Sequence, residues 1–487
     1  MMSPVPEKPG FFDSARIPVG ICLLLNMTLF AVTWWHHPEY LKNEAPHLNP
    51  DAGFYISVGQ NFLFRGEFSR STEPPYTPDF GVTPTYPLFA GALEFVGSTA
   101  AIYFAQVILS LFTCYFIYRF AAFFFTKKTA WLAAMLFALD PLPVSYNFQP
   151  MSEMPYLFLM MWGLVILAPV LSRASGEMSE TQGRRVFVRL ISAGVILGIA
   201  ILARPAGLYL PVILCVMLAW RFFSAKIGVR RTVSLTLLFF LCAYLPVISW
   251  IGRNYVTFGM PKLARTQTIM LVYYTGASAW QVHHGISREE AQELIQKTYD
   301  LPSHTACHNP EFYGLAPAEI EAKLRPHQWE ILLAYPRELA ISSLTGILKG
   351  TLAHNTAEIA YISDFSWQSP GITELLAGRE KENRDSPGNP LSLNLFFLYA
   401  VGFNFFLLIS AGVGGIRCLA HRPARFIFCL LAGILLYGVL TMAVAGTDCV
   451  ARYRIPNLPV MYLFAAVCFV GFTVAPPALL HTPKASP

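Results

Sequence analysis

The sequence has few charged residues. Only 13% of its 487 residues are Asp, Glu, Lys or Arg, whereas 54% are hydrophobic, among them 38 Phe and 22 Tyr. A soluble globular protein carries about 25% charged residues, so this deficit argues against a soluble protein and places the chain in a lipid bilayer. The net charge of +6 is modest. No DNA- or RNA-binding motif is visible, so we expect no nucleic-acid partner.

The sequence also lacks a visible internal repeat. No small-residue cleavage site follows its first hydrophobic run at 17–35, so we expect an uncleaved first span. A bilayer core needs about 20 apolar residues per helix. Further runs of this kind lie at 101–125, 129–148, 152–171, 187–203, 206–222, 232–252, 391–416, 424–445 and 456–476. The predicted fold is an all-α polytopic membrane protein, a bundle of about 10–12 transmembrane helices with outer-face amphipathic helices.

Short basic loops predict the orientation of these spans. They lie near 119–128, 173–189, 221–231 and 417–425, and a cytoplasmic N-terminus puts all of them in the cytoplasm. Two large segments, 36–100 and 253–390, then lie outside. Within the second, 338–360 is half apolar but charged, and we interpret it as an interfacial helix, although a further span stays open.

This topology predicts three regions. Residues 1–252 form a transmembrane core whose first outer loop, 36–100, bears a catalytic Asp. Residues 253–390 form an extracytoplasmic segment with interfacial helices, and residues 391–487 form the C-terminal transmembrane helices.

Asp51 opens a predicted surface helix at 51–65, just beyond the first span, and Tyr55 follows one turn later on the same face. An Asp after Pro is also an ordinary helix N-cap, so both roles stay open. Other polar residues gather at the outer ends of spans: Tyr86, Glu153, Arg204, Arg253, Asn254, Tyr255, Arg452 and Arg454. A charge costs about 2.5–3.5 kcal/mol at the centre of a membrane helix, so such groups usually face a cavity or a partner. The alternatives are a helix N-terminal charge for Glu153 and snorkelling anchors for the arginines.

Six motifs occur in order along the chain: Asp51-x-x-x-Tyr55, Thr83-Pro84-Thr85-Tyr86-Pro87-Leu88, Ser152-Glu153, Arg204-Pro205-x-Gly207, Arg253-Asn254-Tyr255-x-x-Phe258-Gly259 and Arg452-Tyr453-Arg454-x-Pro456. The set resembles the GT-C class of membrane glycosyltransferases, specifically relatives of protein O-mannosyltransferases and lipid A aminoarabinose transferases. The resemblance implies a GT-C-like bundle, a polyprenyl-phosphate sugar donor and an outer-face active site whose invariant acidic residue maps onto Asp51. Two positions depart from the pattern. Ala52 replaces the second member of an acidic pair found in many relatives, and Thr83 stands where a basic or aromatic residue is expected.

The expected reaction moves a sugar to an acceptor hydroxyl of a glycolipid, polysaccharide or protein, with inversion. A carboxylate can take the hydroxyl proton, and Arg suits a departing phosphate, so one carboxylate among arginines suffices. We expect Asp51 as the catalytic base, Arg253, Arg452, Arg454 and Arg204 as donor phosphate-binding residues, and Tyr55, Glu153, Asn254, Tyr255 and Tyr86 as sugar- or acceptor-binding residues.

We expect no cofactor; a divalent metal stays open as an alternative, since some GT-C enzymes use one. The segment His304-x-x-Cys307-His308 is the one tempting metal-ligand cluster, and it lacks a nearby fourth ligand. The expected partners are the lipid-linked donor, the acceptor and the bilayer, in a multi-pass protein of the bacterial inner membrane. A transporter or flippase of lipid-linked saccharides is the alternative from another class, and an O-antigen ligase or polymerase is a third reading.

Overall fold

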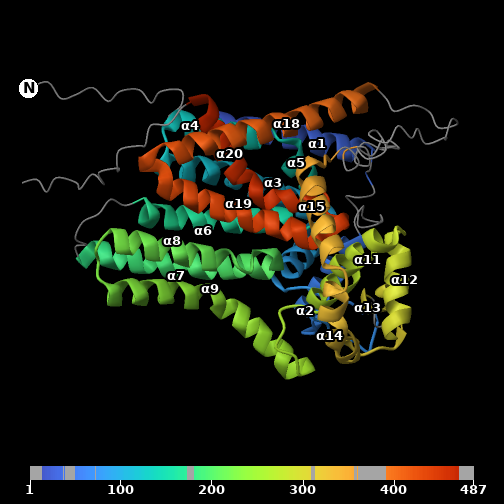
Figure 1. Cartoon of the computed structure of the whole chain (residues 1–487). Helices are drawn as coiled ribbons and strands as arrows, with labels where there is room; N and C mark the ends of the chain where they lie inside the picture. Colours follow the sequence, from blue (N-terminus) through green and yellow to red (C-terminus); the bar gives the residue numbers. More distant parts are fainter. Residues whose placement is uncertain are drawn as a thin grey trace, which may run out of the picture.

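The structure, a computed structural model, describes residues 14–36, 38, 50–71, 73–172, 180–308, 313–355, 359 and 391–470. Most residues in these ranges lie in helices, and none of them lies in a β-strand. Long helices lie side by side in a bundle, and a group of shorter helices covers one end of it (Figure 1). The predicted all-α membrane fold is confirmed.

Nine of the described helices are long and apolar enough to cross a membrane. They are α1 (Arg16–His36), α3 (Thr85–Phe124), α6 (Glu153–Leu171), α7 (Glu180–Ala203), α8 (Leu210–Ser224) with the 3-10 turn before it, α9 (Val229–Phe258), α18 (Leu391–Ala420), α19 (Arg425–Ala445) and α20 (Leu458–Val470). The span expected at 129–148 is instead divided into α4 (Lys127–Leu139) and α5 (Pro141–Tyr146). Asp140 separates the two helices and caps α5, because its Oδ1 accepts from the backbone N–H of Leu142 at 2.8 Å.

Apolar patterning decides which helices lie inside the bundle. The sequence of α20 is apolar on all sides, and most of that helix is buried. By contrast, α9 lies at the periphery and exposes Leu237, Leu241 and Leu245, which recur every four residues. Such a stripe on a membrane helix faces lipid.

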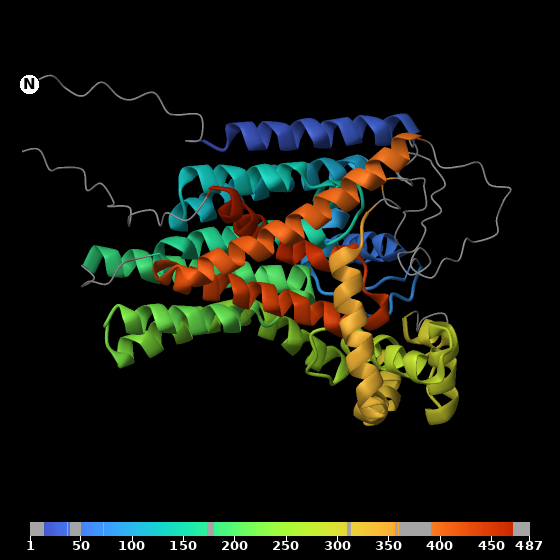
Figure 2. The ribbon, with the colours of Figure 1, turned by 45° about the horizontal axis from the view of Figure 1, so that its top comes forward.

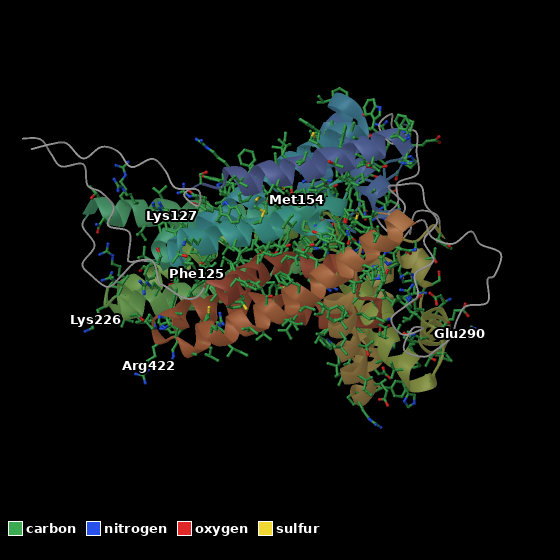
Figure 3. The ribbon with its side chains drawn as sticks, turned by 90° about the horizontal axis from the view of Figure 1, so that it is seen from above. Phe125, Lys127, Met154, Lys226, Glu290 and Arg422 are labelled. Atoms are coloured by element: carbon green, nitrogen blue, oxygen red, sulfur yellow. The ribbon has the colours of Figure 1, made fainter. Side chains whose placement is uncertain are left out.

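Residues of the short basic loops lie together at one end of the bundle. Lys127, Lys226 and Arg422 lie at one end and Glu290 lies at the other (Figure 3). The surface helix α2 (Pro50–Arg65) lies at the end away from the basic loops (Figures 1 and 2). The geometry therefore separates α2 from the basic loops, as the predicted orientation requires.

The shorter helices at that end have a core of their own. They are α10 (Thr266–Ile269), the π-helical segment Met270–Gly276, α11 (Ala277–His284), α12 (Arg288–Tyr299), α13 (His304–His308), α14 (Pro317–Leu333) and α15 (Pro336–Leu352). Their buried core includes Val272, Tyr273, Trp280 and Ile295.

The interfacial helix expected at 338–360 corresponds to α15, which is bent by 90° from α14 and runs across the ends of the spans (Figures 1 and 2). Gly346 permits a close approach to the end of α19, since a Cβ there would lie 2.5 Å from the carbonyl oxygen of Gly446. Ile341, Leu344 and Leu348 are exposed. This placement favours the interfacial interpretation. Residues 356–358 and 360 lie outside the described residues.

Candidate active site

A contact between two glycines fixes the position of α2. Gly59 of α2 lies against the first turns of α3, where a Cβ on it would come within 1.9 Å of the carbonyl oxygen of Pro87. A Cβ on Gly91 would likewise come within 2.5 Å of the carbonyl carbon of Gly59. The two helices therefore pack backbone to backbone. The predicted helix at 51–65 is confirmed, with Asp51 in its first turn, where the helix dipole favours a carboxylate.

Asp51 lies beside an arginine from the far end of the chain. The Nη1 atom of Arg452 is 3.8 Å from Oδ2 of Asp51, and the side chains are 23% and 47% exposed, respectively. Arg452 belongs to the 3-10 helix Ala451–Asn457, which precedes α20. The carboxylate is thus held near a cation while remaining accessible.

A second, buried ion pair lies close by. Glu153, in the first turn of α6, pairs with Arg204, which follows α7, and their side chains are 1% and 12% exposed. The ring of Tyr453 lies near both arginines, with centroid distances of 5.9 Å to Arg204 and 5.7 Å to Arg452. Glu153 therefore combines the N-terminal position weighed above with a specific cationic partner.

Tyr55 lies within electrostatic range of both pairs. Burial, together with the negative charges of Asp51 and Glu153, raises the pKa of Tyr55 to about 12, against the opposing effect of the two arginines. Its hydroxyl is therefore protonated at neutral pH and can donate a hydrogen bond. The structure brings together one exposed carboxylate, one buried carboxylate, two guanidinium groups and a phenol: Asp51, Glu153, Arg204, Arg452 and Tyr55.

Tyr86, expected to contact sugar or acceptor, is fully buried. Its ring packs edge-on against Tyr55 with centroids 4.8 Å apart, and its hydroxyl donates to Oε1 of Gln106 at 3.2 Å. Tyr86 therefore helps to hold the ring of Tyr55 in place.

Arg454 has a different role from the phosphate contact expected of it. It is only 4% exposed and donates to the carbonyl oxygens of Gly350 at 3.4 Å, Ala353 at 3.1 Å and Thr351. These carbonyls form the C-terminal end of α15, which has no further helical donors. Arg454 therefore caps α15, and we withdraw it from the phosphate-binding set.

The Arg253-Asn254-Tyr255 motif belongs to another cluster. It lies in the last turns of α9, which continues beyond the expected end at 252 to Phe258. Arg253 donates to the carbonyl of Asp79 at 2.8 Å, and Asn254 donates to the carbonyl of Lys262 at 2.8 Å. Tyr255 is 59% exposed. These contacts make Arg253 and Asn254 anchors of the chain around α9.

Sequence reasoning missed Asp79, which organises this second cluster. Its Oδ2 lies 2.7 Å from Nη2 of Arg70, and its Oδ1 lies 3.7 Å from Nη2 of Arg265. Burial opposes ionisation of Asp79, but the two arginines and a hydrogen bond from the Gly81 N–H hold its pKa below the usual value. Arg70 also donates to the carbonyl of His308 at 2.8 Å. The cluster thus ties the segment between α2 and α3 to the segment that follows α9, and no local sequence pattern signals such a contact.

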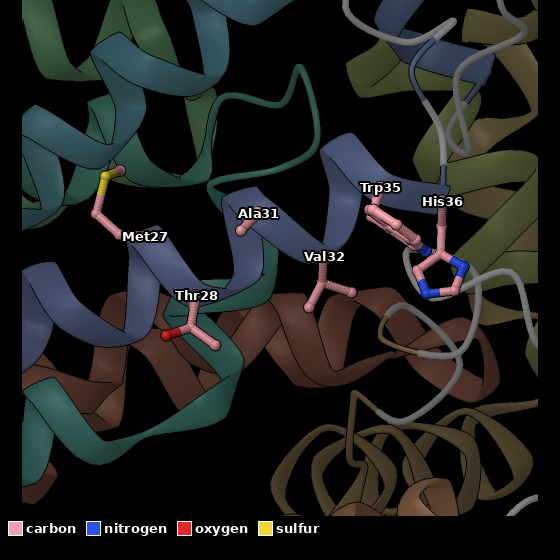
Figure 4. Close-up of a pocket in the computed structure, with 6 residues that line it drawn as sticks. All are labelled: Met27, Thr28, Ala31, Val32, Trp35 and His36. Atoms are coloured by element: carbon pink, nitrogen blue, oxygen red, sulfur yellow. The ribbon is translucent and has the colours of Figure 1, made fainter.

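The described residues bring together no group of three or more His, Cys, Asp or Glu side chains that could hold a metal ion. The rings of His304 and His308 have centroids 4.7 Å apart, and Cys307 is a buried free thiol. A hollow of about 570 Å³ lies along one face of α1, lined by Met27, Thr28, Ala31, Val32, Trp35 and His36 (Figure 4). Neither Asp51 nor Arg452 lines it.

Residues 86–250, about a third of the chain, match the family model described as dolichyl-phosphate-mannose-protein mannosyltransferase. This stretch holds Tyr86, Glu153 and Arg204, whereas Asp51 and Arg452 lie outside it. No curated protein matches the chain.

Solved structures extend the comparison. The Archaeoglobus fulgidus oligosaccharyltransferase tethered with an acceptor peptide matches with a TM-score of 0.51 at 15% identity, over 93% of this chain and 49% of that one. The chain thus spans about half the length of that enzyme. The S. cerevisiae protein O-mannosyltransferase Pmt1–Pmt2 complex, bound to the sugar donor, gives 0.38 at 12% identity, over 50% of this chain and 34% of that one. ArnT from Cupriavidus metallidurans, bound to undecaprenyl phosphate, matches with a TM-score of 0.36 at 14% identity, over 92% of this chain and 77% of that one.

The first of these likenesses shows a shared fold, and the family model adds a match in sequence. The resemblance to the GT-C class of membrane glycosyltransferases that the ordered motifs indicate is therefore confirmed, by a family model over residues 86–250 and by fold over 93% of the chain.

Proposed function

We propose that this protein transfers a sugar from a polyprenyl-phosphate carrier to an acceptor hydroxyl on the extracytoplasmic face of a membrane, with inversion at the anomeric carbon. One observation carries the proposal. The accessible carboxylate of Asp51 lies 3.8 Å from Arg452, beside the buried Glu153–Arg204 pair. This group includes residues of α2, at the end of the bundle away from the basic loops, which supports an extracytoplasmic site.

The attack requires a base. The acceptor O–H proton passes to the carboxylate of Asp51 as the acceptor oxygen forms its bond to the anomeric carbon. General-base catalysis of this kind typically contributes about 10²–10⁴-fold. The attack comes from the face opposite the phosphate, so the bond to the phosphate oxygen breaks on the other side and the configuration inverts.

The leaving group requires cations. The phosphate keeps the electron pair of the broken C–O bond, and its added negative charge is stabilised by Arg452 and Arg204. Arg452 is also the partner of Asp51. A bound donor phosphate therefore competes with Asp51 for Arg452.

Two further residues hold this arrangement. Glu153 is buried against Arg204 and fixes that guanidinium in the low-dielectric interior, where an unpaired cation is costly. Tyr55 keeps its proton and donates to an oxygen of the sugar or acceptor. We propose that these side chains suffice without a metal ion, and that the lipid tail of the carrier lies against the apolar bundle. The matched family, named for dolichyl-phosphate-mannose, supports a carrier of this class.

The test uses the purified protein in detergent with a radiolabelled polyprenyl-phosphate sugar and glycolipid, polysaccharide and peptide acceptors. We expect label in an acceptor, release of polyprenyl phosphate, and an inverted anomeric configuration by NMR. Detergent has no sealed compartment, so transport cannot produce this signal. Absence of transfer, together with saccharide movement across sealed vesicles containing the protein, would favour the flippase alternative and overturn the proposal.

A further inference from the structure

Gln106 is a buried amide in the membrane-spanning part of α3, and its side chain is fully enclosed. Its Oε1 accepts from the hydroxyl of Tyr86 at 3.2 Å. Its Nε2 donates to the carbonyl oxygens of Asn147 at 3.0 Å and Gln149 at 2.8 Å. An amide inside an apolar bundle is costly unless both of its ends are satisfied, as they are here.

The first set of contacts leads to Glu153. The carbonyls of Asn147 and Gln149 belong to the buried turn that joins α5 to α6, and α6 begins at Glu153. The amide of Gln106 therefore holds the turn that immediately precedes one of the two ion pairs of the site.

The second contact leads to Asp51. Tyr86 lies in the first turn of α3, packs against Tyr55, and is followed by the Pro87 carbonyl against which Gly59 of α2 is seated. The backbone of α3 departs from helical geometry at Gly97 and Ser98, between Tyr86 and Gln106. The Tyr86–Gln106 hydrogen bond thus crosses this break and joins the part that carries α2 to the part that spans the membrane.

We infer that Gln106 is a positioning residue that sets the separation between Asp51 on α2 and the Glu153–Arg204 pair at the start of α6. It touches neither substrate nor reacting atoms and acts through Tyr86 and the 147–153 turn. This inference rests on the proposed function for its kinetic readout. In-line transfer needs the base and the phosphate-binding cations at a fixed distance, and a misplacement of about 1 Å can cost about 10²-fold in rate.

The kinetic test compares Gln106→Met and Tyr86→Phe with Ser110→Ala. Ser110 is also buried in α3, one turn further along, and its hydroxyl contacts Cys22 at 3.7 Å. We expect kcat to fall about 10- to 100-fold in Gln106→Met and less in Tyr86→Phe, with donor KM within about threefold of wild type. Ser110→Ala should keep the wild-type kcat. The double variant should resemble Gln106→Met alone, because both changes remove the same bond.

A second readout does not depend on activity. Hydrogen–deuterium exchange of the full-length protein in detergent should show faster exchange of both the 147–153 turn and α2 in Gln106→Met, and of neither in Ser110→Ala. Faster exchange in the turn alone would confine Gln106 to that turn and overturn the inference, as would a wild-type kcat in Gln106→Met. If the wild-type protein showed no transfer activity, the proposed function would be wrong. The exchange result would still decide whether Gln106 couples α2 to the 147–153 turn.

Discussion

Nη1 of Arg452 lies 3.8 Å from Oδ2 of Asp51, although one residue opens α2 near the start of the chain and the other precedes α20 near its end. The candidate site therefore forms only when α2 and the 3-10 helix before α20 are both docked. This explains why the motifs that indicate the GT-C class are spread along nearly the whole sequence. The predictions below test this arrangement.

Arg452→Gln should weaken donor binding. A hydrogen bond to a charged group contributes about 1.5–3 kcal/mol, so we expect kcat/KM for the donor to fall about 10- to 100-fold, with a higher donor KM and a lower kcat. The unfolding temperature should change little, because Arg452 is partly exposed. Steady-state kinetics with a polyprenyl-phosphate sugar and a thermal melt in detergent measure the two effects.

Arg454→Gln is the matched control. It should lower the stability of the protein and leave donor binding unchanged. It replaces the guanidinium that caps α15 by a shorter, neutral amide and so weakens the bonds to the Gly350 and Ala353 carbonyls, at a cost of about 1–3 kcal/mol. We expect a lower unfolding temperature and an unchanged donor KM. A raised donor KM at full stability would instead return Arg454 to the phosphate site.

Gly59→Ala should displace α2, because its Cβ would meet the backbone of Pro87 at 1.9 Å. Overpacking of this kind typically costs about 1–3 kcal/mol, and kcat should fall with it as Asp51 moves. Gly53→Ala, two residues from Asp51, meets nothing within 4 Å and should gain about 0.5–1 kcal/mol from its helical position. Thermal melts and kcat values of the two variants provide the comparison, and equal losses in both would contradict the docking described for α2.

Acid should loosen the contact between the segment that carries Asp79 and the segment that carries His308. Burial, reinforced by His304, Arg265 and Arg70, lowers the pKa of His308 to about 3, so between pH 6.5 and that value the unfolded chain binds a proton that the folded protein does not. Folding stability therefore falls as the pH is lowered through this window, by about 2 kcal/mol at pH 5. The pKa of Asp79 is also lowered. The ionised Asp79 therefore stabilises the fold at pH values above 3.8, its usual pKa, and this stabilisation is lost as the pH falls further.

The measurement is Tm against pH from 7.5 to 4.5 for wild type, His308→Gln and the control His327→Gln, whose side chain is 38% exposed. His308→Gln should flatten the acid side of the curve, and His327→Gln should follow wild type. Identical slopes in all three proteins would contradict the assignment.

Local patterns allowed the helix at 51–65 and the spans other than 129–148 to be predicted, because hydropathy and helical spacing are properties of neighbouring residues. Which arginine reaches Asp51 is not such a property. Arg452 and Arg454 are two positions apart on a 3-10 helix of about three residues per turn, so their side chains point in different directions. One contacts Asp51 and the other α15.

Arg253 shows a second limit of sequence reasoning. Its motif was expected after a span, but α9 continues to Phe258 and ends where Gly259 adopts the left-handed conformation at φ 70°. Its guanidinium then lies against the carbonyl of Asp79, a residue of the segment between α2 and α3. Contacts between such distant segments, like those of Gln106, have no counterpart in local sequence.

The central claim is that Asp51 is the base for sugar transfer, and the most direct measurement is the single-turnover rate of Asp51→Asn with saturating labelled donor. Glu67→Gln, which alters an exposed carboxylate just beyond α2, is the control. We predict a loss of about 10²-fold or more in Asp51→Asn, since general-base catalysis supplies at least that factor, with wild-type rates in Glu67→Gln. A rate above about a tenth of wild type in Asp51→Asn would contradict the account.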